Sequence, residues 1–273
     1  MQSLYLDTID ATLCWHDLPG AGAPLVCLPA LSFAAAANFL DVISDPVLQR
    51  HRRLLIDLPG SGFSEPAHNF DYTPRAHAEV VARILDHINL GPSVVFGHSM
   101  GGSVAVALAD ARPDLVRHLV VAEGNLVPGG GAGSRRIGGY DRAEFLKSGY
   151  DEALAGIRAE AVAGDEFLSF LHANWTLADP AALHGNACGL IDLDPGLEAA
   201  FLGLDLPRTF VYGDKSLAHN PGAADVPEPD HLAEGGVAIS VIPQAGHFMT
   251  RDNPGAVAQM LAGVLAATEG ASA

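Results

Sequence analysis

A serine flanked by glycines separates an apolar segment from a helical one. The sequence over Gly97–Gly101 is G-H-S-M-G, with the apolar run Ser93–Phe96 before it and the helix-forming run Gly102–Ala109 after it. A sharp turn from a buried strand into a helix is crowded, and glycines two positions before and after the serine supply the room. This pattern predicts a strand, a tight turn and a helix, with the Ser99 hydroxyl exposed above a sheet near a helix N-terminus. A serine in that place is a candidate nucleophile.

Apolar segments alternate with helical segments along the rest of the chain. Residues 73–89 carry apolar side chains at helical spacing, and a last helix is expected over residues 255–268. Strands are expected at Leu4–Leu6, Ala11–Trp15, Pro24–Pro29, Arg53–Asp57, Ser93–Phe96, Val116–Ala122, Arg208–Gly213 and Ala238–Pro243. The first two should pair antiparallel, and the others predict the α/β class, with a mostly parallel sheet covered on both faces. A functional site in such a sheet lies at the carboxyl ends of the strands.

One long segment breaks this alternation. Residues 126–204 contain no convincing strand, begin with the glycine-rich Pro128–Gly133 and include the aromatic residue Trp175. An insertion between two core strands is a natural lid over a site, although extra packing helices without a gating role would give the same pattern. We therefore expect an α/β core made of residues 1–125 and 205–273, with a helical cap at residues 126–204.

The net charge of −17 and the sparse cysteines restrict the partners of the chain. A surface this acidic repels nucleic acid and anionic membranes, so we expect neither as a partner. Cys14, Cys27 and Cys188 fit neither a zinc site nor a disulfide framework. The sequence shows neither a basic N-terminal segment before an apolar run nor a stretch of about 20 apolar residues. We expect a cytoplasmic protein that acts on a small molecule without a metal or cofactor, with a homodimer left open.

A serine hydroxyl becomes a good nucleophile only when a base removes its proton and a carboxylate orients that base. Among 12 histidines, the best-placed base is His247, which directly follows the last apolar strand in a loop that leads to the C-terminal helix. His98 is next to the serine, but at a sharp turn its side chain should point away from Ser99. A solvated loop histidine without a role is the alternative interpretation of His247.

Three motifs occur in a fixed order along the chain. Asp57–Ser64 reads D-L-P-G-S-G-F-S and matches the pattern D-x-P-G-x-G-x-S, Gly97–Gly102 reads G-H-S-M-G-G, and Gly246-His247 precedes an Asn-Pro pair. With the order of the strands, these motifs resemble the α/β-hydrolase superfamily over nearly the whole chain. The resemblance implies an eight-stranded, mostly parallel sheet flanked by helices, with a helical cap inserted before the last two strands. It also implies that Ser99 is the nucleophile and His247 the base, with the acid between them in the sequence.

The acid departs from the commonest pattern of that superfamily. Many relatives carry an aspartate three residues after the glycine that ends the penultimate strand. Here Gly213 is followed at that distance by Ser216, and Asp214 comes two positions too early. Another branch carries the acid after the next strand along the chain, the one that follows the helix directly after the nucleophile. Glu123 stands there, directly after Val116–Ala122, and the run Glu-Gly-Asn-Leu resembles a subgroup that uses this glutamate.

Glu123 is therefore the predicted acid. A carboxylate close to the sheet edge is partly buried, which is costly unless a cation such as an imidazolium pairs with it. A solvated carboxylate at the end of a strand is the alternative interpretation. Asp214 is the second candidate, because a rearranged loop could bring it to the histidine. Further alternatives are Asp225, Glu228 and Asp230.

Two backbone N–H groups are needed to stabilise the negative charge that develops on an attacked carbonyl oxygen. One is expected from Met100, directly after the nucleophile. The other is expected from the loop after the third predicted strand, where Pro29 has no N–H to donate. By alignment with the family's loop, Leu31 is the first candidate for this oxyanion hole and Ala30 the second, with an additional contact from the Ser32 hydroxyl.

These residues predict a cofactor-independent serine hydrolase that acts on a small, mainly apolar ester or lactone through an acyl-enzyme. The same triad can hydrolyse a carbon–carbon bond of a diketone, and a non-catalytic ligand-binding protein could keep the fold and even the triad. Haloalkane dehalogenases and most epoxide hydrolases of this fold carry an aspartate in place of Ser99, so those activities are not expected. Asn125, Arg135 and Arg136 either line the mouth of the site or cap and solvate the hinge of the lid.

Overall fold

Eight strands form a single sheet in the part of the chain that the computed structural model describes, residues 1–219 and 227–270. Their order across the sheet is β1-β2-β4-β3-β5-β6-β7-β8. The strands are β1 (Gln2–Leu6), β2 (Ala11–Leu18), β3 (Gly22–Leu28), β4 (His51–Ile56), β5 (Ser93–His98), β6 (Val116–Ala122), β7 (Arg208–Gly213) and β8 (Ala238–Ile242). β2 runs antiparallel to β1 and β4, and the other neighbouring strands are parallel. The predicted α/β class and the mostly parallel sheet are confirmed.

The helices follow the strands in the chain. They are α1 (Ala35–Ile43), α2 (Pro74–His87), α3 (Met100–Ala111), α4 (Ala132–Gly138), α5 (Arg142–Glu144), α6 (Tyr150–Val162), α7 (Glu166–Trp175), α8 (Pro180–Ile191), α9 (Leu197–Gly203), α10 (Asp214–His219), α11 (Pro229–Glu234), α12 (Met249–Asp252) and α13 (Pro254–Gly270). Short 3-10 segments occur at η1 (Pro46–Leu48) and η2 (Pro113–Leu115), and a π-helical turn at η3 (Phe145–Gly149). Within the described residues, no helix has the length and apolar character needed to cross a membrane.

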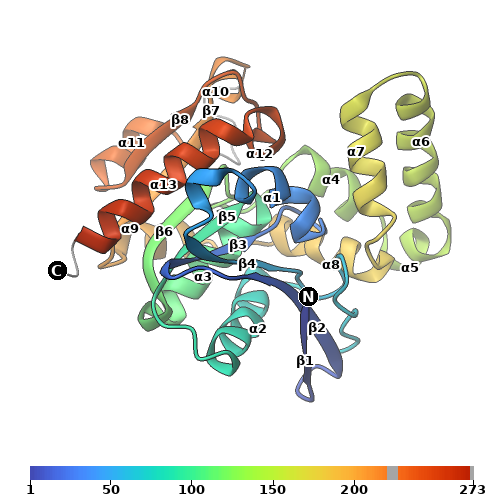
Figure 1. The fold of residues 1–273 in the computed structure, drawn as a ribbon. Coiled ribbons are helices and arrows are strands. Elements are labelled where there is room, and N and C mark those ends of the chain that lie inside the picture. Colours follow the sequence, from blue (N-terminus) through green and yellow to red (C-terminus); the bar gives the residue numbers. More distant parts are fainter. Residues whose placement is uncertain (220–226, 271–273) are drawn as a thin grey trace.

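Helices cover both faces of the sheet (Figure 1). Successive side chains of a strand point to opposite faces, so a strand buried on both faces is apolar throughout. In β5, Val94 and Phe96 pack in the core that includes α1 and α13, whereas Val95 packs in the core that includes α2 and α3. This double burial explains why the strands are continuous apolar runs in the sequence.

The parallel strands bring distant loops to one edge of the sheet. β3, β5, β6, β7 and β8 run in the same direction, so their carboxyl ends lie together. The segments that follow these ends contain residues 29–34, Ser99, Glu123, Asp214 and residues 243–248. Most of the residues predicted for the site therefore lie at this edge.

Helices α4 to α9 fill the segment between β6 and β7, and residues 126–204 form no strand. α6 packs against α7 and α4 against α8, whereas α9 packs against α3. Figure 1 shows α6 and α7 standing beside the sheet rather than on either of its faces. The predicted helical insertion before the last two strands is confirmed, and a separate cap bounded at residues 126 and 204 stays a prediction.

Candidate active site

Ser99 lies between the last residue of β5 and the first residue of α3. Its φ of 53° and ψ of −121° lie in a region that non-glycine residues rarely adopt. A Cβ atom on Gly97 would lie 2.2 Å from the carbonyl oxygen of Gly101, and one on Gly101 would lie 2.0 Å from that of Leu28. Both flanking glycines are therefore required by the close approach of the backbone.

Ser99, His247 and Glu123 form one chain of hydrogen bonds at the sheet edge. Nε2 of His247 lies 3.0 Å from Oγ of Ser99, and Nδ1 of His247 lies 2.9 Å from Oε2 of Glu123. A carboxylate can only accept, so Nδ1 carries the proton and Nε2 is left to accept from the serine hydroxyl. The structure thus brings together the three residues that the sequence singled out as nucleophile, base and acid.

The Glu123 carboxylate is only 2% exposed and accepts three hydrogen bonds. Besides His247, the backbone N–H of Gly213 donates to Oε1 at 2.8 Å and the hydroxyl of Ser216 donates to Oε2 at 3.2 Å. Burial alone would raise the pKa of Glu123, but the hydrogen bonds and the charge of His247 outweigh it and lower that pKa. The side chain is therefore an ionised carboxylate, and Ser216 supports it from the place where many relatives carry the acid.

Asp214 does not reach the histidine. Its carboxylate accepts from the backbone N–H groups of Gln244 at 2.8 Å and Ala245 at 3.0 Å, and these bonds lower its pKa. Asp214 thereby stabilises the backbone of the loop that precedes His247. Glu228 and Asp230 line the adjoining cavity without bonding to His247, and Asp225 lies outside the described residues.

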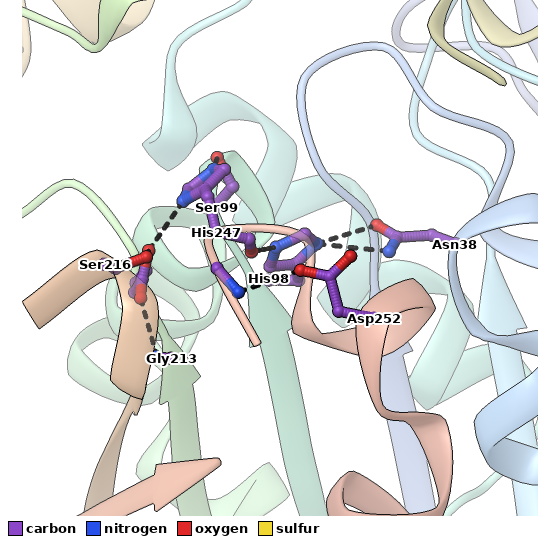
Figure 2. A network of polar contacts seen from close by, with 9 residues as sticks. Asn38, His98, Ser99, Gly213, Ser216, His247 and Asp252 are labelled. Atoms are coloured by element: carbon purple, nitrogen blue, oxygen red, sulfur yellow. Dashed lines mark hydrogen bonds and ion pairs between the residues drawn. The ribbon is translucent and has the colours of Figure 1, made fainter. Parts of the chain in front are cut away.

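His98 bonds to neighbouring loops instead of to Ser99 (Figure 2). Its Nε2–H donates to the carbonyl oxygen of His247 at 2.7 Å, and its Nδ1 then accepts from Nδ2 of Asn38 at 3.1 Å. The ring is fully buried, and burial lowers the pKa of His98 to about 3. A neutral histidine that already uses both nitrogens cannot serve as the base.

The amide of Asn38 also decides which N–H groups are free. Its Oδ1 accepts the backbone N–H of Ala30 at 2.8 Å, so the N–H of the second candidate for the oxyanion hole already has a partner. Among the described residues, no acceptor bonds the N–H of Leu31. Met100 is the first residue of α3, a position whose N–H has no partner within the helix. Of the donors predicted for the oxyanion hole, those of Met100 and Leu31 therefore have no hydrogen-bond acceptor in the described part of the chain.

A cavity of about 940 Å³ opens onto Ser99 and His247. Much of its wall is apolar and comes from the loop after β3, from α7 and from the loop before α12. These residues are Leu31, Phe33, Phe167, Leu171, Trp175 and Phe248. Asn125 and Arg136 line the cavity as well, whereas Arg135 bonds to the carbonyls of Gly129 and Gly130 in the glycine-rich segment that precedes α4.

No cluster of three or more histidine, cysteine, aspartate or glutamate side chains within residues 1–219 and 227–270 is arranged to hold a metal ion. The groups at this edge are those of acid–base and nucleophilic chemistry.

Comparisons with known proteins agree with this architecture. Residues 23–136 match the sequence family described as alpha/beta hydrolase fold. An enol-lactonase from Burkholderia xenovorans has a similar structure, with a TM-score of 0.77 and 18% identity over 97% of this chain and 100% of the lactonase. Residues 23–136 thus belong to the α/β-hydrolase family, and the chain as a whole has the α/β-hydrolase fold.

This α/β hydrolase also has curated relatives. The sn-1-specific diacylglycerol lipase of Mus musculus is 25% identical over 236 residues, which cover 81% of this chain and 74% of the lipase. The 2-hydroxy-6-oxo-2,4-heptadienoate hydrolase of Pseudomonas putida is 36% identical over 109 residues, which cover 39% of this chain and 38% of that enzyme. The latter match spans well under half of the relative's length.

The Asp57–Ser64 motif of this α/β hydrolase stabilises the backbone next to the site through the side chain of Asp57. Oδ1 of Asp57 accepts the N–H of Ala35 at 2.7 Å and Oδ2 accepts that of Phe63 at 2.9 Å. The first bond fixes the start of α1, the helix that carries Asn38. Sequence analysis did not single out Asn38, although a lone amide on the buried face of an apolar helix was a signal that could have identified it.

Proposed function

We propose that this α/β hydrolase is a serine hydrolase that cleaves a small, mainly apolar ester or lactone through an acyl-enzyme intermediate. The observation that carries the proposal is the chain of hydrogen bonds from Ser99 through His247 to Glu123. Ser99 lies on a strained turn, and a largely apolar cavity opens beside it. Geometry of this kind activates a serine hydroxyl.

In the first step, Oγ of Ser99 attacks the carbonyl carbon of the substrate while Nε2 of His247 takes the hydroxyl proton. Glu123 holds the ring in the tautomer that can accept, and stabilises the imidazolium that forms. The carbonyl oxygen becomes negatively charged and accepts from the N–H groups of Met100 and Leu31. When the carbon–oxygen bond to the leaving group breaks, His247 returns the proton to the departing alcohol.

In the second step, water replaces the alcohol. His247 removes a proton from the water, whose oxygen attacks the acyl carbon, and the same two N–H groups stabilise the new oxyanion. Collapse breaks the bond to Oγ of Ser99, which regains its proton from His247, and the carboxylic acid leaves.

The walls of the cavity favour a substrate with an apolar acyl or alcohol part. Phe33, Phe167 and Trp175 line it, and Phe167 and Trp175 belong to the proposed cap. The names of relatives support this substrate class, since the mouse relative is a diacylglycerol lipase and the structural neighbour an enol-lactonase.

A second candidate is hydrolysis of a carbon–carbon bond in a diketone that carries a carboxylate. The Pseudomonas relative is named for an oxo-dienoate substrate, and the exposed guanidinium of Arg136 at the cavity wall could pair with such a carboxylate. We expect Arg136→Ala to raise KM for a carboxylated diketone and to leave KM for a neutral ester unchanged.

The test is a panel of p-nitrophenyl esters of graded acyl length, lactones and diketones, run beside labelling with a fluorophosphonate. We expect ester or lactone turnover and a covalent label on Ser99, both lost in Ser99→Ala. Turnover of diketones alone would favour the second candidate. Absence of both turnover and label in the unmodified chain would contradict the proposal and favour a non-catalytic ligand-binding protein.

A further inference from the structure

The N–H of Leu31 belongs to a tight turn with an unusual backbone. The N–H of Phe33 donates to the carbonyl of Ala30 at 3.0 Å and closes the turn, and Ser32, its third residue, has a φ of 53°. A positive φ at the third residue is the mark of a type II turn, where glycine is preferred. A serine in this position is strained, so contacts from outside the turn must hold it.

Two side chains from the 126–204 insertion supply those contacts. The indole N–H of Trp175, in α7, donates to the carbonyl oxygen of Leu31 at 3.3 Å, and Nδ2 of Asn186, in α8, donates to the hydroxyl of Ser32 at 3.0 Å. Trp175 is 4% exposed and Asn186 fully buried. These bonds are therefore shielded from competing water.

A third residue fixes the orientation of the Asn186 amide. His77, in α2, is fully buried, and burial lowers its pKa to about 4, so its ring is neutral. Its Nε2 lies 2.6 Å from Oδ1 of Asn186. Because an amide oxygen only accepts, Nε2 of His77 carries the proton, and the amide nitrogen is directed at Ser32.

We propose that Trp175 and Asn186 are positioning residues for the oxyanion hole, through which the helices of the insertion set the place of the Leu31 N–H. The inference rests on the proposed function, in which that N–H stabilises the tetrahedral intermediate. Without the indole N–H, the carbonyl of Leu31 loses a buried partner, so the strained turn is held less firmly and the backbone of Leu31, with its N–H, can shift. The turn then no longer holds its donor at the distance that the oxyanion requires.

The same tryptophan also lines the cavity. A substrate bound in the cavity therefore contacts Trp175, the residue that positions the Leu31 N–H. Binding of the apolar part of the substrate and stabilisation of the developing charge are thus linked through one side chain.

The test is Trp175→Phe, which keeps an aromatic ring and removes the N–H. Removal of an oxyanion donor costs about 10²–10³ in kcat, and for a donor that is displaced but still present we expect kcat to fall about tenfold, with KM changed less than about threefold. The inhibition constant of a trifluoromethyl ketone, whose adduct carries the same oxyanion, should rise by the same factor as kcat falls. Ser32→Ala, which removes the acceptor of Asn186, should lower kcat about threefold and gives a second route if Trp175→Phe does not fold.

The matched control is Tyr150→Phe. The Tyr150 hydroxyl bonds to the carbonyls of Trp175 and Ala178, so this variant removes a hydrogen bond of the insertion without touching the turn. A kcat for Trp175→Phe within twofold of the unmodified chain would overturn the inference. So would an equal fall in Tyr150→Phe, which would indicate general loosening of the helices. An unmodified chain that shows neither turnover nor labelling would instead contradict the proposed function.

Discussion

Two carboxylates follow neighbouring parallel strands, Glu123 after β6 and Asp214 after β7, and they bond to different partners. Glu123 is 2% exposed and accepts from His247, whereas Asp214 is more exposed and accepts from the backbone of the next loop. Glu123 adopts a φ of 41°, and its longer side chain reaches the ring. The comparison shows that the donors around a strand-end carboxylate, rather than its place after a strand, decide whether it can serve as the acid.

The largest effect should come from Glu123→Gln. An amide at this position can donate to Nδ1, which favours the wrong tautomer of His247, so we expect kcat to fall about a thousandfold. The measurement is kcat for the best ester or lactone of the panel, with circular dichroism to verify folding. A fall of less than tenfold would show that Glu123 does not orient the base.

A carboxylate introduced at position 216 should partly restore the activity of the Glu123→Gln variant. Ser216 lies where many relatives carry an aspartate, and its hydroxyl is 3.2 Å from the Glu123 carboxylate. An aspartate there can reach His247, so we expect Ser216→Asp in the Glu123→Gln background to raise kcat about tenfold over the single variant. Ser216→Asn in the same background is the control, and equal rates in the two double variants would contradict the relocation.

The ionised Glu123 should also make stability depend on pH. Its folded-state pKa is lowered, so its contribution is present above the ordinary glutamate pKa of about 4.3 and is lost as pH falls through the folded value. We expect the difference in unfolding free energy between the unmodified chain and Glu123→Gln to shrink as pH falls below that ordinary value. A difference that stays constant in urea unfolding from neutral to acidic pH would contradict a lowered pKa.

The smallest effect on catalysis should come from Asp214→Asn. The variant keeps an acceptor oxygen for one of the two backbone N–H groups, and Asp214 makes no contact with His247. We expect kcat to fall less than about threefold, because the loop before His247 is loosened without loss of the acid. A fall as large as that of Glu123→Gln would reverse the roles of the two carboxylates.

The sequence predicted those features that depend on short stretches of chain. Continuous apolar runs reveal strands buried on both faces, and the spacing of Gly97 and Gly101 around Ser99 reflects backbone contacts within one turn. Glu123 could be proposed from the resemblance to one branch of the superfamily, and because a carboxylate directly after a buried strand requires a partner.

The remaining features depend on contacts between distant residues. Asn38 bonds to residues 60 and 212 positions away, and these contacts decide that Leu31 rather than Ala30 has the free N–H. Helix α1 itself was not predicted, since it begins in a run of alanines with no polar cap. No local pattern encodes such pairings, and only the folded chain brings the residues together.

The most direct test of the acid measures how fast Ser99 reacts, independent of any substrate. The second-order rate constant for fluorophosphonate labelling can be followed by intact-protein mass spectrometry in the unmodified chain, in Glu123→Gln and in Asp214→Asn. If Glu123 orients His247, labelling of Glu123→Gln should be slower by about tenfold or more, while Asp214→Asn labels at the unmodified rate. An unchanged rate in Glu123→Gln, or an equal loss in Asp214→Asn, would contradict the assignment.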